Sequence, residues 1–164
     1  MNLSAQNKKG HASRQAGFTL IEILLVIGIL AILIAITLIA INPARQFSQA
    51  NNTQRSSDVT AILNAINQYM IDNDGAVPAG SGVAISATPT NMGSNNAIDV
   101  NICNDIIPLY IAELPVDPRT GSITTGPCSV YNTAYDVYRS ATNNRITVTA
   151  DDTELGIPDI FVTR

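Results

Sequence analysis

The feature that most constrains this chain is an apolar block at residues 18–41, FTLIEILLVIGILAILIAITLIAI, which has no charged residue after Glu22. As an α-helix this block would rise about 36 Å, enough to cross a hydrocarbon core of about 30 Å. Basic residues precede it at Lys8, Lys9 and Arg14. Because positive charge tends to stay in the cytoplasm, the sequence predicts a membrane-spanning helix whose C-terminal body is exported.

Two ordinary alternatives compete for the same block. The apolar region of a cleaved secretory signal runs about 7–15 residues and ends at a small-residue cleavage site. This block is longer and continues into Asn42-Pro43 without such a site. A plain membrane anchor fits the length but leaves Glu22 to be explained, because a carboxylate inside a membrane is costly unless it is paired or lies at the interface. At headgroup depth, the dipole of the helix N-terminus would favour its negative charge.

The distribution of charge limits the chemistry of the body. The chain has nine Lys and Arg, thirteen Asp and Glu, and one histidine, His11. Without residues 1–17 the body keeps six arginines and thirteen acids, a formal charge of −7, with no lysine and no histidine. It therefore lacks the basic clusters that bind nucleic acid. The missing residue types also exclude a Ser-His-Asp triad, a Schiff-base lysine and a His-ligated zinc, so we expect no enzyme.

A short basic leader, the string Gly17-Phe18-Thr19-Leu20-Ile21-Glu22 and a long apolar helix follow one another at the N-terminus. Together they resemble the prepilin signature of type IV pilins and of the pseudopilins of type II secretion. The resemblance covers residues 1 to about 45. It implies that a prepilin peptidase cuts between Gly17 and Phe18 and methylates the new Phe18 amine. It also implies that Glu22 of one subunit meets the Phe18 amine of a neighbour in a helical filament.

The remaining chain predicts an α+β fold of the pilin type. Pro43 indicates a break after the apolar helix. Residues 46–58 are almost wholly polar, and apolar residues recur at helical spacing from Val59 to Met70, so we expect a long helix with a weak middle. Ser57 or Asp58 could cap a start there, and Gly75 is a good stop. The expected parts are a cleaved leader at 1–17, an apolar helix at 18–43, an amphipathic helix at 44–75 and a head at 76–164.

Within the head, three alternating runs predict an antiparallel sheet of about three strands packed on the helix: Tyr131–Arg139, Arg145–Ala150 and Asp159–Thr163. A further short strand near Val83–Ala87 and a short helix at Ile106–Leu114 are also expected. The string Leu114-Pro115-Val116-Asp117-Pro118 is similar to a loop of major pseudopilins and of some pilins, although such strings also occur in ordinary turns.

Two further features are candidate sites. Cys103 and Cys128 are expected to form a disulfide in an oxidising compartment, and the alternative is a pair of buried free thiols. The acids Asp151, Asp152, Glu154 and Asp159 gather near one loop. Calcium takes oxygen ligands from acidic loops, and major pseudopilins bind it in a comparable place, but this spacing differs from theirs. A solvated acidic turn is the better interpretation, and no other cofactor is expected.

Three functional hypotheses follow. The first is a structural subunit of a type IV pilus-like filament that assembles through residues 18–41, with the precursor in the inner membrane and its head outside. The second is a type II secretion pseudopilin or a minor pilin, which the acidic loop and the Pro-containing string favour. The third is a permanently membrane-anchored binding or enzymatic domain. The resemblance implies as partners further copies of the chain, a prepilin peptidase and an assembly platform.

Overall fold

The computed structural model describes residues 17–164, so the expected leader lies, apart from Gly17, outside the described residues. The chain divides into two compact units at the boundary between Asn42 and Pro43. The break falls where Pro43 predicts it. Asn42 takes a left-handed conformation with φ 48°, and asparagine tolerates this region better than most residues with a side chain.

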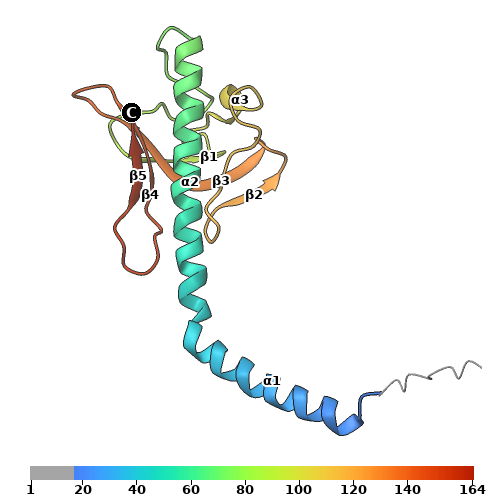
Figure 1. Ribbon diagram of the computed structural model, residues 1–164. Coiled ribbons are helices and arrows are strands. Elements are labelled where there is room, and N and C mark those ends of the chain that lie inside the picture. The colour runs from blue at the N-terminus through green and yellow to red at the C-terminus, as the bar shows by residue number, and fades with distance from the viewer. Residues whose placement is uncertain (1–16) are drawn as a thin grey trace, which may run out of the picture. The chain divides into compact units, whose positions relative to one another are not determined.

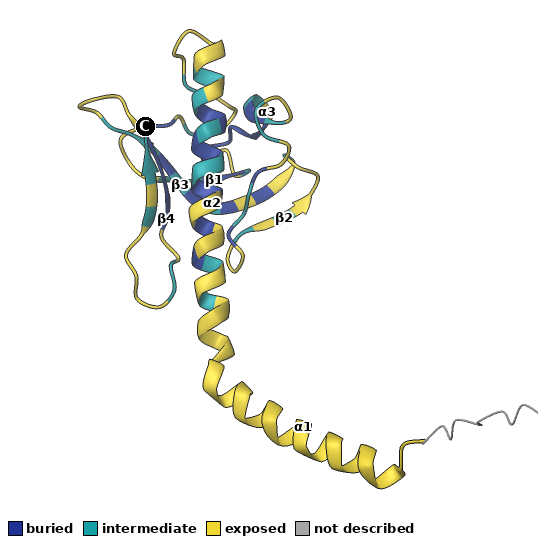
Figure 2. Cartoon of the chain, viewed as in Figure 1, coloured by how far each residue is buried: buried dark blue, intermediate teal, exposed yellow. Residues whose placement is uncertain are grey.

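The first unit contains helix α1, Leu20–Ile41, whose 22 residues rise about 33 Å. Thr19 caps its start: the side chain accepts a hydrogen bond from the amide of Glu22. Every residue of α1 is exposed, as its uniform colour in Figure 2 shows. Nothing within the described unit covers its isoleucines and leucines.

The second unit begins with helix α2, Pro43–Asp72. Proline suits the first helical position because its missing N–H would have no intrahelical partner there. The helix passes through residues 46–58 without interruption, so a separate start at Ser57 or Asp58 is wrong. It ends as expected before Gly75, whose amide donates to the carbonyl of Met70 and whose φ is +85°.

The head contains a five-stranded antiparallel sheet rather than about three strands. The strands are β1 Thr90–Gly93, β2 Ser122–Thr125, β3 Val130–Arg139, β4 Ile146–Ala150 and β5 Ile160–Thr163. The order is β1-β3-β4-β5, and β2 pairs with β3. The three strands expected from alternation are therefore confirmed, while β1 and β2 are additions. No strand forms at residues 83–87.

Helix α2 packs on β4 and β5 and crosses the sheet in Figure 1. Its apolar stripe provides Val59, Ile62, Leu63 and Ile66, all without exposed surface. Register aligns Val137 of β3 with Val148 of β4, and Val148 with Val162 of β5, so that one face of the sheet meets the stripe. The expected packing of sheet on helix is confirmed.

The short helix of the head lies earlier in the chain than expected. Helix α3 is Cys103–Ile106, and Ile107 is already extended, with φ −98° and ψ 139°. Pro108 disfavours a helical conformation of the residue before it, so the expected helix at Ile106–Leu114 does not form.

Candidate functional site

The segment predicted to be processed lies open at the start of α1. Gly17 and Phe18 precede the helix, and the Phe18 side chain is 80% exposed. Glu22 lies in the first helical turn and is the one charged residue of α1. Among the described residues no side chain binds its carboxylate. Gly17, Phe18 and Glu22 therefore lie on one exposed segment, and their roles in processing and assembly stay predictions.

The surface of α1 suits an apolar environment on all sides. The helix is long and apolar enough to cross a membrane. Its one hydroxyl, on Thr37, donates to the carbonyl of Ile34 at 2.9 Å and so has a partner inside the helix. Such a helix can be surrounded by lipid or by apolar helices of other subunits without leaving a polar side chain unpaired, Glu22 apart.

The polar residues in the middle of α2 form a buried ion cluster with two distant loops. Arg55 and Asp117, 62 residues apart, both have side chains with no exposed surface. The guanidinium donates from Nε to Asp117 Oδ2 at 2.6 Å and from Nη2 to Oδ1 at 3.2 Å. This two-pronged geometry is the strong form of the arginine–carboxylate pair. It fixes the Leu114–Pro118 loop against the helix.

Glu154 extends the cluster into the C-terminal loop. Its Oε1 accepts from Arg119 Nη1 at 2.6 Å, and its Oε2 accepts from Asn51 at 2.9 Å and lies 3.5 Å from Arg55 Nη1. The Asn52 side chain accepts from the Glu154 amide and donates to the Glu154 carbonyl. Helix α2 therefore holds this residue by both its side chain and its backbone.

These contacts set the protonation of the cluster. Burial alone would raise the pKa of Asp117, but hydrogen bonds from Arg55 and from the amides of Arg119 and Thr120 hold the pKa below its usual range. Hydrogen bonds from Asn51 and Arg119 lower the pKa of Glu154. The hydrogen bond to Asp117 raises the pKa of Arg55. The cluster is therefore ionised at neutral pH.

A second buried acid, Asp58, lies on α2 about one helical turn after Arg55. Asp58 accepts from the Tyr135 hydroxyl at 2.9 Å and from Gln54 at 2.9 Å. Burial raises the pKa of Asp58, despite these two hydrogen bonds, and burial also raises the pKa of Tyr135. This pair ties α2 to the middle of β3.

Sequence reasoning missed these bonded residues because it treated residues 46–58 as a weak, polar part of the helix. The sequence does contain a signal that part of this polar segment is buried. The positions Asn52, Arg55, Val59, Ile62 and Ile66 are spaced by three and four residues, so the polar segment continues the face of the apolar stripe. The sequence pattern indicates that Asp117 lies in a loop, but it does not indicate that Arg55 is the partner of Asp117.

The acids that are candidates for calcium binding differ in their hydrogen-bond partners and in their exposure. Asp151 accepts from Thr149, Asp152 accepts from Thr120, and Asp159 is exposed. Across residues 17–164 no three or more His, Cys, Asp or Glu side chains gather in a way that could hold a metal ion. The solvated acidic turn, and calcium binding as its weaker alternative, both stay predictions.

The cysteines are joined. Cys103 and Cys128 form a disulfide with Cα atoms 5.5 Å apart, as the sequence predicts. Cys103 begins α3, and Cys128 lies in the turn between β2 and β3. The bond therefore ties the chain after β1 to the start of the longest strand.

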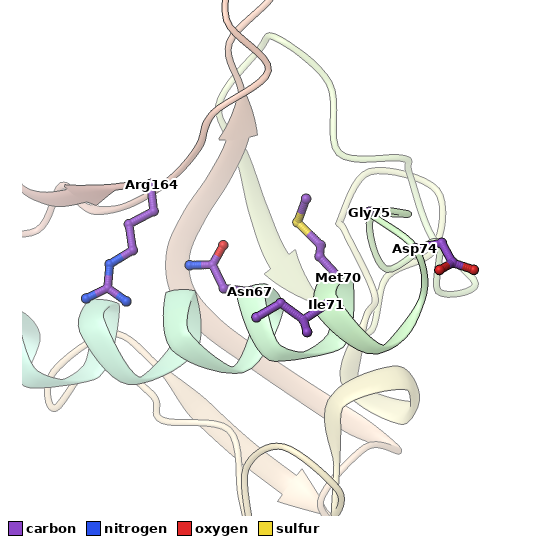
Figure 3. Close-up of a pocket in the computed structure, with 6 residues that line it drawn as sticks. All are labelled: Asn67, Met70, Ile71, Asp74, Gly75 and Arg164. Atoms are coloured by element: carbon purple, nitrogen blue, oxygen red, sulfur yellow. The ribbon is translucent and has the colours of Figure 1, made fainter.

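An open groove of about 560 Å³ lies at the end of α2, and Figure 3 shows its lining. Met70 and Ile71 form its apolar wall. The charged side chains, Arg164 and Asp74, lie at opposite ends of the groove, and Arg164 donates to Asn64. They do not converge on a common point, as the polar groups of a catalytic pocket do.

Comparisons with known proteins match both parts of the chain. Residues 12–40 match the family model described as the prokaryotic N-terminal methylation motif. Type II secretion system core protein G of Pseudomonas aeruginosa is 32% identical over 80% of this chain and 91% of its own length. The proteins of the same name from Vibrio cholerae and Aeromonas hydrophila are 30% and 39% identical, over 66% and 41% of their own lengths. No solved structure matches the chain.

The methylation motif lies on the same segment as the prepilin signature, and together with α1 it indicates a membrane-anchored subunit. The Pseudomonas relative extends the similarity through the head. The resemblance to prepilins is therefore confirmed, and this chain belongs to the family of type II secretion system core protein G, the pilin-like structural subunits known as pseudopilins.

Proposed function

We propose that the chain is the filament-forming subunit of a type II secretion system and assembles through α1 after its leader is removed. The observation that carries this proposal is the exposed apolar surface of α1, a helix of 22 residues with no buried residue and a single charge near its start. A surface of this kind needs an apolar partner along its whole length. The membrane supplies it first, and copies of the same helix supply it in a filament.

The chemistry at the N-terminus explains how register is set. A peptidase hydrolyses the Gly17–Phe18 bond, and the new amine of Phe18 receives a methyl group and keeps its positive charge. Each subunit then carries a cation at Phe18 and an anion at Glu22. In a stack of helices offset along the filament axis, the anion of one subunit pairs with the cation of the next. A misplaced pair would leave unpaired charge among isoleucines and leucines, which is costly.

The partners follow from this life cycle. The precursor lies in the inner membrane with its leader in the cytoplasm and its head outside. A prepilin peptidase removes the leader on the cytoplasmic face, and an assembly platform in the same membrane acts on the mature subunit. The mature subunit then joins a homopolymer. It performs no catalysis of its own, and an acidic body without lysine or histidine gives it no surface for nucleic acid.

A subunit of an extracellular type IV pilus is the second candidate. The disulfide at Cys103–Cys128 favours it, because a cross-link that braces the loops suits a head displayed outside the cell. The names of the relatives favour the secretion system.

Mass spectrometry of the N-terminal peptide separates these candidates. We would compare sheared surface filaments with washed membranes of the native cells. A peptide that begins with N-methyl-Phe18 and is recovered mainly from membranes supports a pseudopilin. The same peptide in abundance in the sheared fraction supports a pilus subunit instead. An intact leader in both fractions would contradict assembly after processing and leave a permanent membrane anchor.

Glu22→Gln tests assembly itself. The substitution removes the negative charge and keeps the size of the side chain, so we expect the processed subunit to remain in the membrane while filaments decrease at least tenfold. Glu113→Gln removes one negative charge from an exposed position of the head and should leave the yield of filaments unchanged. Normal filaments from Glu22→Gln would show that assembly does not depend on the charge of Glu22.

A further inference from the structure

The C-terminal loop, residues 151–159, is acidic, yet side-chain cations already engage its central carboxylate. Glu154 meets Arg119 at 2.6 Å and Arg55 at 3.5 Å. Arg119 follows the Asp117-Pro118 turn, and Arg55 comes from the middle of α2. Two guanidinium groups from separate parts of the head thus converge on one residue of the loop.

The side chains around Glu154 do not fit a calcium ion. Calcium takes about six to eight oxygen ligands, several of them carboxylate oxygens. Both oxygens of Glu154 accept hydrogen bonds from nitrogen donors, and both oxygens of Asp117 are bound by Arg55. Asp152 accepts from the Thr120 hydroxyl at 2.7 Å. A dication beside Glu154 would also be repelled by the two guanidinium groups.

We propose that Arg55 and Arg119 are the positioning residues of the C-terminal loop: their guanidinium groups supply the positive charge that holds Glu154 against α2, so that the order of residues 151–159 does not depend on calcium. Arg55 also neutralises Asp117, which keeps the loop at Leu114–Pro118 in place beside it. The buried arginine joins the two loops to the helix, and the exposed arginine closes the cluster from the solvent side.

Hydrogen exchange of the full chain in detergent tests the calcium part. Amide exchange in the peptide that covers residues 151–159 would be measured in millimolar calcium and in chelator, at matched ionic strength. We expect equal exchange rates in the two conditions. Slower exchange of this peptide in calcium, with unchanged exchange in β3 and β4, would overturn the proposal.

The charge of Arg119 is tested by two substitutions at that position. Arg119→Gln should speed exchange of the 151–159 peptide about two- to fivefold, the range expected for a partly exposed ion pair, and leave β3 and β4 unaffected. Arg119→Lys restores the charge and should return the exchange rate toward that of the original chain. Arg145→Gln, which removes an exposed arginine bonded to the Thr163 carbonyl, is the matched control.

Two results at Arg119 would overturn the proposal: unchanged exchange in Arg119→Gln, or the same rapid exchange in Arg119→Lys as in Arg119→Gln. The second result would mean that the shape of the side chain, and not its charge, positions the loop. Because Arg119 is 62% exposed, its substitution leaves the core intact. The test therefore does not depend on variants of Arg55, which risk unfolding the head.

Discussion

Arg55 has no exposed surface, and its position explains why a polar stretch of sequence forms a stable helix. A buried guanidinium must replace the hydrogen bonds it had with water, and here Asp117, Asn52 and Glu154 provide them. A pair of this kind adds little stability over a well-packed apolar pair, but removal of one member is severe. Arg55 therefore acts mainly on specificity: it favours the one arrangement of the two loops in which Asp117 and Glu154 face its guanidinium group.

Arg55→Met is expected to lower the free energy of unfolding by about 3–5 kcal/mol, because it leaves the Asp117 carboxylate buried without its partner. Chemical denaturation followed by circular dichroism would measure the loss. Arg145→Met, at an exposed position, is the control and should change stability by less than about 1 kcal/mol. Equal effects of the two substitutions would contradict the role of the buried pair.

Glu154→Gln is expected to change how stability depends on pH. Hydrogen bonds from Asn51 and Arg119 lower the pKa of Glu154 in the folded chain, whereas unfolded glutamate has a pKa of about 4.3. The ionised carboxylate therefore stabilises the fold above that value, and this contribution is lost as pH falls through the lowered pKa.

The measurement is the difference in unfolding free energy between the original chain and Glu154→Gln, taken at several pH values. The original chain should be the more stable at neutral pH, and the difference should shrink as pH falls below about 4. Glu113→Gln, an exposed substitution, serves as the control. If this difference in unfolding free energy stayed constant through the acid range, the charge of Glu154 would not stabilise the fold.

At the scale of elements, the disulfide connects α3 to the turn before β3. Cys103→Ala combined with Cys128→Ala should cost about 3.5 kcal/mol, since the cross-link restricts a loop of 25 residues in the unfolded chain. Thermal unfolding with and without a reductant would measure it. The reductant should destabilise the original chain to a similar degree and leave the double variant unchanged. A double variant as stable as the original chain would contradict this account.

The elements that could be predicted from sequence are those with a strong local pattern. The apolar run gives α1, helical spacing gives the second half of α2, and alternation gives β3, β4 and β5. Strands β1 and β2 have the sequences TNMG and SITT, which show no alternation and depend on β3 for their pairing. The helix expected at Ile106–Leu114 spans Pro108, and a proline disfavours a helical conformation of the residue before it.

The residues of the candidate site also differ in whether local sequence could predict them. Gly17, Phe18 and Glu22 could be found because they lie within six consecutive residues. The bond between Arg55 and Asp117 could not, because it joins residues 62 apart and depends on how the loop folds over α2. Local spacing shows that Arg55 shares the buried face, but it does not show which carboxylate lies opposite.

At the scale of the whole molecule, the chain combines two units with different requirements. No residue of α1 is buried, so this unit takes its stability from its surroundings. The second unit has a core of its own, built from α2, the sheet and α3 (Figure 2). The boundary at Asn42 and Pro43 separates a part with no buried residue in α1 from a part with a core of its own.

A chain reduced to residues 43–164 should therefore fold without detergent and unfold at the same temperature as the full chain in micelles. The ion cluster and the apolar stripe both begin after residue 50, and Pro43 remains a suitable first residue for α2. Thermal unfolding followed by circular dichroism would measure this. A markedly lower midpoint would show that α1 contributes to the stability of the head.

A second truncation, to residues 60–164, tests why the boundary lies where it does. It keeps most of the apolar stripe but removes Asn52, Arg55 and Asp58, so Asp117 and Glu154 lose their partners on the helix. We expect this chain to be unfolded or to aggregate, because both loops lose the helical segment that they pack on and Asp117 loses its guanidinium partner. If it folded as well as residues 43–164, the apolar stripe alone would hold the head, and the polar half of α2 would serve assembly rather than stability.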